Sequence, residues 1–208
     1  MDIYKYNTIL RQEYEKTGNI ETLIKYVISE TIPPIADFEN AVRIIRSNYK
    51  TNVNSTLLII GAYIASEWGG ADNEFLEILS LMYNYLSPKE KSMISFLKAR
   101  HMHNYDKNYI VNPKYKQYLI ESIKHDGTVV NNKKYLADLY RKCFARNKAN
   151  KLYKEAISNI IEIHSEETIK QMTIEHFLDP QAFIDEHILG THISYINYQL
   201  LCDKVNTI

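Results

Sequence analysis

The chain has 208 residues with 25 basic and 25 acidic side chains, so its formal net charge is zero. This balance removes the global electrostatic argument for binding nucleic acid or an anionic membrane. Hydrophobic residues make up 45% of the chain, and only six glycines and five prolines occur. This composition favours long helices around a substantial core, in one domain or one repeat array.

The N-terminal residues, the longest apolar run and the cysteines together predict a cytoplasmic protein. The N-terminal residues lack a basic region followed by an apolar core, so no signal peptide is expected. The longest apolar run, 57–65, is interrupted by Gly61 and is too short to span a bilayer. No membrane partner is therefore expected. Cys143 and Cys202 lack metal-ligand spacing, so we expect two reduced thiols.

Helical periodicity runs through the first half of the chain, with turn signals about every fifteen residues. Five helices are predicted there, over Ile3–Tyr14, Leu23–Ile28, Asp37–Ile45, Leu57–Trp68 and Phe75–Leu86. Gly18 and Gly69-Gly70 are the expected stop signals of the first and fourth helices. Asn54-Ser55 is predicted to cap the fourth helix, and Asp72 the fifth.

The second half of the chain carries stronger start signals. Ser87-Pro88-Lys89-Glu90 is a capping box with proline in the first turn, and Asn112-Pro113 repeats the proline signal. The eighth and ninth helices are predicted on either side of a short turn at Asn147. A tenth helix is expected from Ser165. A last segment, Gln181 to about Val205, is expected to break near Gly190.

Large and small residues alternate within 132–163 at the spacing by which two short helices pack closely. The residues are Leu136, Ala137, Tyr140, Ala149, Tyr153 and Ala156. Neighbours three or four apart share one helix face, so these six form two facing stripes. The pattern resembles the tetratricopeptide repeat at six signature positions. It departs from that pattern at Lys133, where a Trp is common, and at Ile161, where a Pro often ends the unit.

This resemblance implies an all-α fold, a right-handed α-α superhelix of about five antiparallel helix pairs. The whole chain, 1–208, would form one such domain with atypical terminal helices. Equivalent positions at Ala41, Phe75, Tyr115 and Ala149 support repeats of similar length. An all-α bundle with one coincidental hairpin is the alternative architecture.

In that family the first helix of each repeat lines a concave groove that binds a partner. Transferring those positions gives an apolar beginning and a basic end to the groove. The predicted groove residues are Leu58, Ala62, Phe96, Arg100, His103, Asn131, Lys134, Arg141 and Lys142. They favour a protein or peptide segment, possibly an acidic one, as the partner. Asp138 stands where a carboxylate-binding groove of this family carries Asn, and would repel a ligand carboxylate.

No catalytic motif appears, so a non-catalytic scaffold or adaptor without cofactor or metal is predicted. One alternative is a nucleic-acid-associated helical repeat that uses the basic residues and tyrosine stacking. Another is a helical metal-dependent hydrolase that uses His125 and Asp126, with His101 or His103 and Asp138. The oligomeric state is left open.

Overall fold

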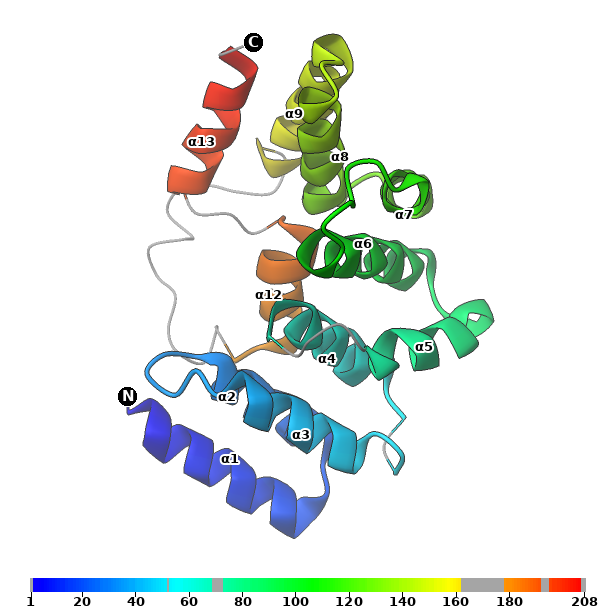
Figure 1. The fold of residues 1–208 in the computed structure, drawn as a ribbon. Coiled ribbons are helices and arrows are strands. Elements are labelled where there is room, and N and C mark those ends of the chain that lie inside the picture. Colours follow the sequence, from blue (N-terminus) through cyan, green and yellow to red (C-terminus); the bar gives the residue numbers. More distant parts are fainter. Residues whose placement is uncertain (1, 52, 69–72, 162–177, 192–194, 207–208) are drawn as a thin grey trace. The chain divides into compact units, whose positions relative to one another are not determined.

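The computed structural model describes residues 2–51, 53–68, 73–161, 178–191 and 195–206 (Figure 1). Every regular element within these ranges is helical, which confirms the prediction of an all-α protein. The chain forms two compact units. Unit 1 comprises 1–85 with 172–184, and unit 2 comprises 86–171 with 185–208. The single array predicted over the whole chain stays a prediction.

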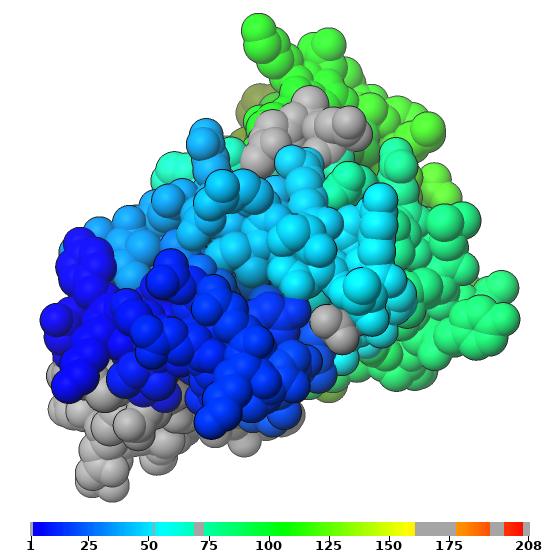
Figure 2. Space-filling view, turned by 90° about the horizontal axis from the view of Figure 1, so that it is seen from below, coloured from blue at the N-terminus to red at the C-terminus, as the bar shows by residue number. Residues whose placement is uncertain are grey.

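Unit 1 is built by packing successive helices. Its elements are α1 Ile3–Thr17, α2 Ile20–Thr31, α3 Phe38–Asn48, α4 Ser55–Trp68, α5 Glu74–Leu81, the 3₁₀ turn η1 Tyr83–Tyr85 and α12 Pro180–Phe183. Each helix from α1 to α5 packs on the next, and α12 returns to α2. Figure 2 shows α1 in dark blue beside the light-blue and cyan atoms of α3, where the Tyr14 hydroxyl donates to Asn48 Oδ1 at 2.6 Å.

Most predicted turn signals of unit 1 act as expected. Gly18 adopts a left-handed φ of 65° after α1, and the Asn54 side chain accepts from the Leu57 backbone N–H. The fifth helix differs from the prediction. Asn73 supplies the N-cap of this helix and also donates to the Ala62 carbonyl at 3.2 Å. The helix ends at Leu81, and the 3₁₀ turn η1 follows it. The predicted cap, Asp72, lies outside the described residues.

Unit 2 contains two helix hairpins and a C-terminal helix. Its helices are α6 Pro88–Tyr105, α7 Pro113–His125, α8 Val130–Lys142, α9 Arg146–Ile161 and α13 Tyr195–Asn206. The π-helical turn η2, Ile184–Leu189, leads into this unit from α12. Helix α6 pairs with α7 and α8 pairs with α9; α7 also packs on α8, and α13 packs on α9.

Local capping sets the helix boundaries of unit 2. Ser87 and Glu90 form the predicted reciprocal capping box, in which the Ser87 N–H donates to Glu90 Oε2 at 2.8 Å. The turn between α8 and α9 was predicted at Asn147 and lies instead at 143–145. Phe144 takes a φ of 60° there, and α9 begins at Arg146. The helix expected from Ser165 lies outside the described residues.

The predicted hairpin core is buried. Ala137, Ala149, Tyr153 and Ala156 are each 0% exposed and belong to one apolar cluster with Leu201 from α13. The two small stripes therefore meet where the sequence placed them, and α13 closes the cluster. The charged residues of α8 lie outside this cluster.

A buried polar cluster fastens three helices of unit 2 to one another. The Ser92 hydroxyl of α6 donates to the Ser122 carbonyl of α7 at 2.9 Å, and the Ser122 hydroxyl donates to the Ser92 carbonyl at 2.8 Å. Asn132 of α8 donates to the Ser122 hydroxyl at 3.0 Å. All three residues are 0% exposed, so these bonds are shielded from water and hold α6, α7 and α8 in register.

Cys143 and Cys202 are free thiols, the first exposed and the second half-buried. Neither reaches a partner sulfur within the described residues, so we expect no intramolecular disulfide. Protein purified under thiol protection should migrate identically with and without reductant on a denaturing gel. A shift of the monomer band on reduction would contradict this prediction.

Candidate binding cavity

Unit 2 holds a cavity of about 520 Å³ at the polar face of α8, which we name the α8 cavity. Its walls come from α6, α7, α8, α13 and the loop between α6 and α7. The lining residues are His103, Tyr109, Tyr115, Lys134, Tyr135, Asp138, Leu139, Arg141, Lys142 and Lys204. The cavity is therefore both basic and aromatic.

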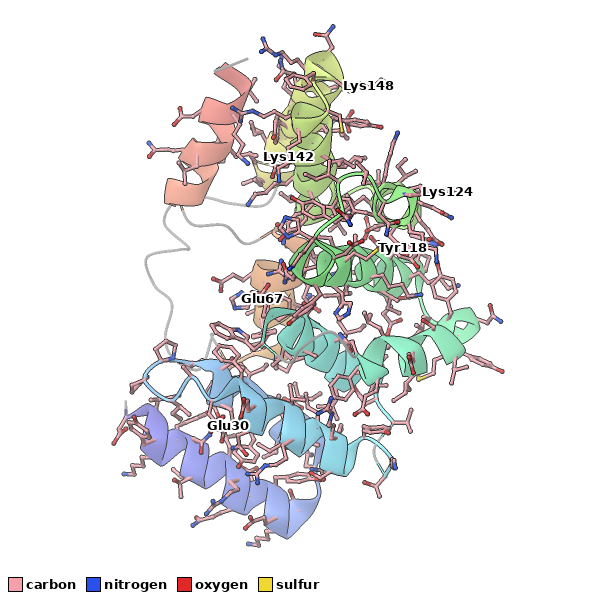
Figure 3. The ribbon with its side chains drawn as sticks, in the orientation of Figure 1. Glu30, Glu67, Tyr118, Lys124, Lys142 and Lys148 are labelled. Carbon is pink, nitrogen blue, oxygen red and sulfur yellow. The ribbon has the colours of Figure 1, made fainter. Side chains whose placement is uncertain are left out.

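Helix α8 presents its charged side chains to the cavity because of their spacing. Lys134, Asp138, Arg141 and Lys142 stand at positions i, i+4, i+7 and i+8, which share one helix face. Val130 and Ala137 of the same helix belong instead to the hairpin core. In Figure 3, Lys142 lies on the side of α8 that faces α13, whereas Lys148 of α9 lies on the other side.

Four of the nine predicted groove residues line this cavity: His103, Lys134, Arg141 and Lys142. Arg100 stands behind the wall, where its Nη1 donates to the Tyr135 hydroxyl at 2.9 Å. These residues of α8 therefore share one cavity with His103, and their role in binding stays a prediction.

The other four predicted residues are placed elsewhere. Leu58, Ala62 and Phe96 are each 0% exposed, so they lie in the core and offer no surface to a ligand. Asn131 is half-buried, and its Nδ2 donates to the backbone carbonyls of Ile188 at 3.1 Å and His187 at 3.4 Å. It fastens η2 to α8 beside Gly190, whose φ is 67°.

Asp138 is held within the protein. Its Oδ1 accepts hydrogen bonds from the Tyr153 hydroxyl at 2.5 Å and from Lys204 Nζ at 2.7 Å. Lys204 also lies over the Tyr153 ring, 5.5 Å from its centroid. The expected repulsion of a ligand carboxylate is therefore offset by the Lys204 ammonium, and Asp138 positions that ammonium at the cavity.

The remaining lining cations are not neutralised by the part of the chain that the structure describes. No carboxylate there lies within ion-pair distance of Lys134, Arg141 or Lys142. Burial lowers the pKa of the Lys134 ammonium, and the positive charges of Lys204 and Arg100 lower it further, while Asp138 acts in the opposite direction. An anion in the cavity would relieve this unfavourable concentration of positive charge.

Tyrosines form the other wall. The Tyr109 and Tyr115 rings make an edge contact with centroids 5.0 Å apart, and His103 contacts Tyr135 in the same way at 5.3 Å. Lys142 Nζ donates to the Tyr109 hydroxyl and lies 5.1 Å from the centre of that ring. Burial raises the pKa of both Tyr115 and Tyr135, so these phenols stay protonated at neutral pH.

Sequence reasoning missed Tyr109, Tyr115, Tyr135 and Lys204 as site residues. Tyr135 could have been predicted as a site residue, because it adjoins Lys134 on a predicted helix. Lys204 could not have been predicted, because its position depends on how α13 packs on α9.

A shallower groove of about 350 Å³ lies on the opposite face of α8. Its lining includes Ile120, Tyr140, Lys151 and Leu152. Tyr140 has lysines near its ring, with Lys116 Nζ 5.3 Å and Lys148 Nζ 5.7 Å from the centroid. This groove supplies residues of the same types as the α8 cavity, outside it.

Asp126 and His103, two of the residues considered as ligands of a hydrolase metal centre, make other contacts in the structure. Asp126 Oδ1 accepts from the Thr128 N–H at 2.9 Å and from the Thr128 hydroxyl at 2.6 Å, which forms a turn. His103 contacts tyrosines of the α8 cavity. In the described ranges, no group of three or more His, Cys, Asp or Glu side chains is arranged to hold a metal ion.

Comparison of the chain with protein-family models, with curated proteins and with solved structures finds no match. The tetratricopeptide resemblance therefore rests on the six signature residues of α8 and α9, four of which are fully buried. None of the described helices has both the length and the apolar character needed to cross a bilayer.

Proposed function

We propose that the protein is a non-catalytic binding module, resembling tetratricopeptide repeats, and that its α8 cavity binds an acidic segment of a protein or peptide in the cytoplasm. One observation supports this above the others. Lys134, Arg141 and Lys142 line one cavity without a carboxylate partner among the described residues, beside a wall of tyrosines. The chain is neutral overall, so attraction of an anion must come from this local group of cations and not from the net charge.

The physical argument concerns where the charges lie. Cations that converge on a cleft with low-dielectric walls attract an anion more strongly than the same cations on an open surface. The half-buried Lys134 ammonium is already incompletely hydrated, so a ligand carboxylate has less water to displace from it. The tyrosine rings supply apolar contact area for the rest of the segment.

Reversing two charges of the cavity tests this proposal. The double variant Lys134→Glu/Arg141→Glu should bind the partner, isolated by pull-down with the unmodified protein, at least about tenfold more weakly. The matched control is Lys151→Glu/Lys154→Glu on the exposed side of α9, which changes the net charge equally. Affinities are measured by titration, with melting curves to show that both variants fold.

The control should change affinity by less than about threefold, because its charges do not line the cavity. Equal losses in the two double variants would mean that only the overall charge matters. The α8 cavity would then not be the binding site.

A nucleic-acid partner is the second candidate, favoured by the combination of cations and tyrosine rings in one cavity. It predicts that the logarithm of the binding constant falls steeply and linearly with the logarithm of the salt concentration. A shallow salt dependence with the isolated partner would exclude it.

A further inference from the structure

The ligand chemistry of the α8 cavity is more specific than an acidic segment. We infer that the cavity recognises a phosphomonoester dianion, carried by a phosphorylated side chain of the bound segment, through the hydroxyls of Tyr135 and Tyr109. This inference rests on the proposed function and specifies its ligand.

The two hydroxyls are donors because cations use them as acceptors. The Tyr135 hydroxyl accepts from Arg100 Nη1 at 2.9 Å, and the Tyr109 hydroxyl accepts from Lys142 Nζ. Guanidinium and ammonium groups cannot accept hydrogen bonds, so each phenol keeps its own hydrogen for another partner. Within the described ranges no acceptor takes either hydrogen, and both residues line the cavity. A donor polarised by a cation binds an anionic oxygen strongly.

The charge in the cavity also matches a dianion. Lys204 is engaged with Asp138, and among the described residues no carboxylate forms an ion pair with Lys134, Arg141 or Lys142. A phosphomonoester carries close to two negative charges at neutral pH and three terminal oxygens. Two hydroxyls, an ammonium and a guanidinium can satisfy those oxygens together. A single carboxylate, with one charge and two oxygens, would leave donors unused.

Both hydroxyls are held in place by their surroundings. Tyr135 packs edge-on against the buried Phe96, with ring centroids 5.3 Å apart. Tyr109 belongs to a loop closed by the Asn112 Nδ2 to Asp106 Oδ2 hydrogen bond of 2.9 Å. Donors that are fixed before the ligand arrives cost little reorganisation on binding. Three cations in one cavity also match a single dianion better than the singly charged diesters along a nucleic acid.

The test compares phenyl phosphate with phenyl sulfate, which have similar shapes and different charges, and compares the phosphoryl group on different carriers. Isothermal titration at pH 7.5 and constant ionic strength uses phenyl phosphate, phenyl sulfate, inorganic phosphate and O-phosphoserine. A second series uses a degenerate peptide mixture with a central phosphoserine, and the same mixture with serine or glutamate there. We expect the phosphoserine mixture to bind at least about tenfold more tightly than either other mixture, and phenyl phosphate similarly more tightly than phenyl sulfate.

Tyr135→Phe removes the donor and keeps the ring. It should weaken binding of the phosphoserine mixture about tenfold or more. Tyr140→Phe, on the opposite face of α8, is the matched control and should leave it unchanged. Melting curves verify folding of both variants. Affinity should also fall below about pH 6, where the phosphomonoester dianion takes up a proton and becomes a monoanion.

Each outcome has a defined meaning. Equal affinity for the phosphoserine and glutamate mixtures would overturn the phosphomonoester inference and leave the proposed function standing. Binding of small phosphate esters but not of the phosphoserine mixture would overturn the inference, because the phosphate would then belong to a small molecule and not to a bound segment. Tighter binding of single-stranded RNA than of the phosphoserine mixture would overturn the inference. Failure of every anion, glutamate mixture included, would overturn the proposed function too.

Discussion

Replacing Ala137 or Ala149 by leucine is expected to lower the free energy of unfolding by about 1–3 kcal/mol. Both alanines are 0% exposed and lie in the cluster that joins α8, α9 and α13. Three additional carbon atoms at either position have no empty volume to enter, so the helices must separate or neighbouring side chains must leave their preferred rotamers. Chemical denaturation followed by circular dichroism measures the change.

Lys151→Leu is the matched control for this prediction. Lys151 lies on α9, two residues beyond Ala149, and its side chain is 79% exposed. The same introduced residue should therefore change stability by less than about 0.5 kcal/mol. Similar unfolding midpoints for all three variants would show that the two alanine stripes do not form a tight contact, and would contradict the repeat interpretation.

Local signals explain why most of the helix boundaries could be predicted from the sequence. The capping box at Ser87 and the proline start at Asn112 act through atoms within three residues of one another. Tertiary contacts hardly change such short-range hydrogen bonds. Where the local signal was ambiguous the prediction was displaced, as at Asn147, because a positive φ at Phe144 completes the turn three residues earlier.

Helix faces were predictable only where the helix is amphipathic. The charged stripe of α8 contrasts with the apolar residues beside it, so Lys134, Arg141 and Lys142 could be assigned to one surface. Helix α4 is buried continuously over 57–62, and α6 over 92–97. A helix that is apolar or buried on all sides gives no periodic signal for its orientation. This explains why the groove positions transferred to α4, and Phe96 on α6, fall in the core.

The contacts of Asp138, and therefore its effect on a ligand, could not be predicted from the sequence either. From the sequence it is an acid among bases, and its effect on a ligand depends on what it contacts. The structure pairs it with Lys204, which is 66 residues further along the chain. No spacing rule connects two residues so far apart, because the contact exists only once α13 has packed on α9.

Lys134→Met is expected to stabilise the protein at neutral pH while weakening the binding of acidic and phosphorylated ligands. Burial, assisted by Lys204 and Arg100, lowers the pKa of Lys134, which means that the fold disfavours the charged ammonium. Methionine keeps a flexible apolar side chain of similar length and removes the charge. Substitutions of this kind commonly add about 0.5–2 kcal/mol of stability.

The pH dependence gives this prediction a definite sign. Between the lowered pKa of Lys134 in the folded state and its ordinary value of 10.5, the unfolded chain holds a proton that the folded chain has released. The unmodified protein should therefore gain stability as the pH rises through this window. The advantage of Lys134→Met should be largest below the lowered pKa of Lys134 and should shrink as the pH rises from there toward 10.5.

Parallel measurements of unfolding free energy and ligand affinity separate a functional cation from a structural one. Lys151→Met, at an exposed position, should alter neither quantity appreciably. If Lys134→Met instead destabilises the protein at pH 7, the ammonium contributes to folding and its place in the cavity needs no ligand to explain it. If stability rises and affinity falls together, the fold retains an unfavourable charge that a bound anion compensates, which is how a binding site differs from a solvated surface.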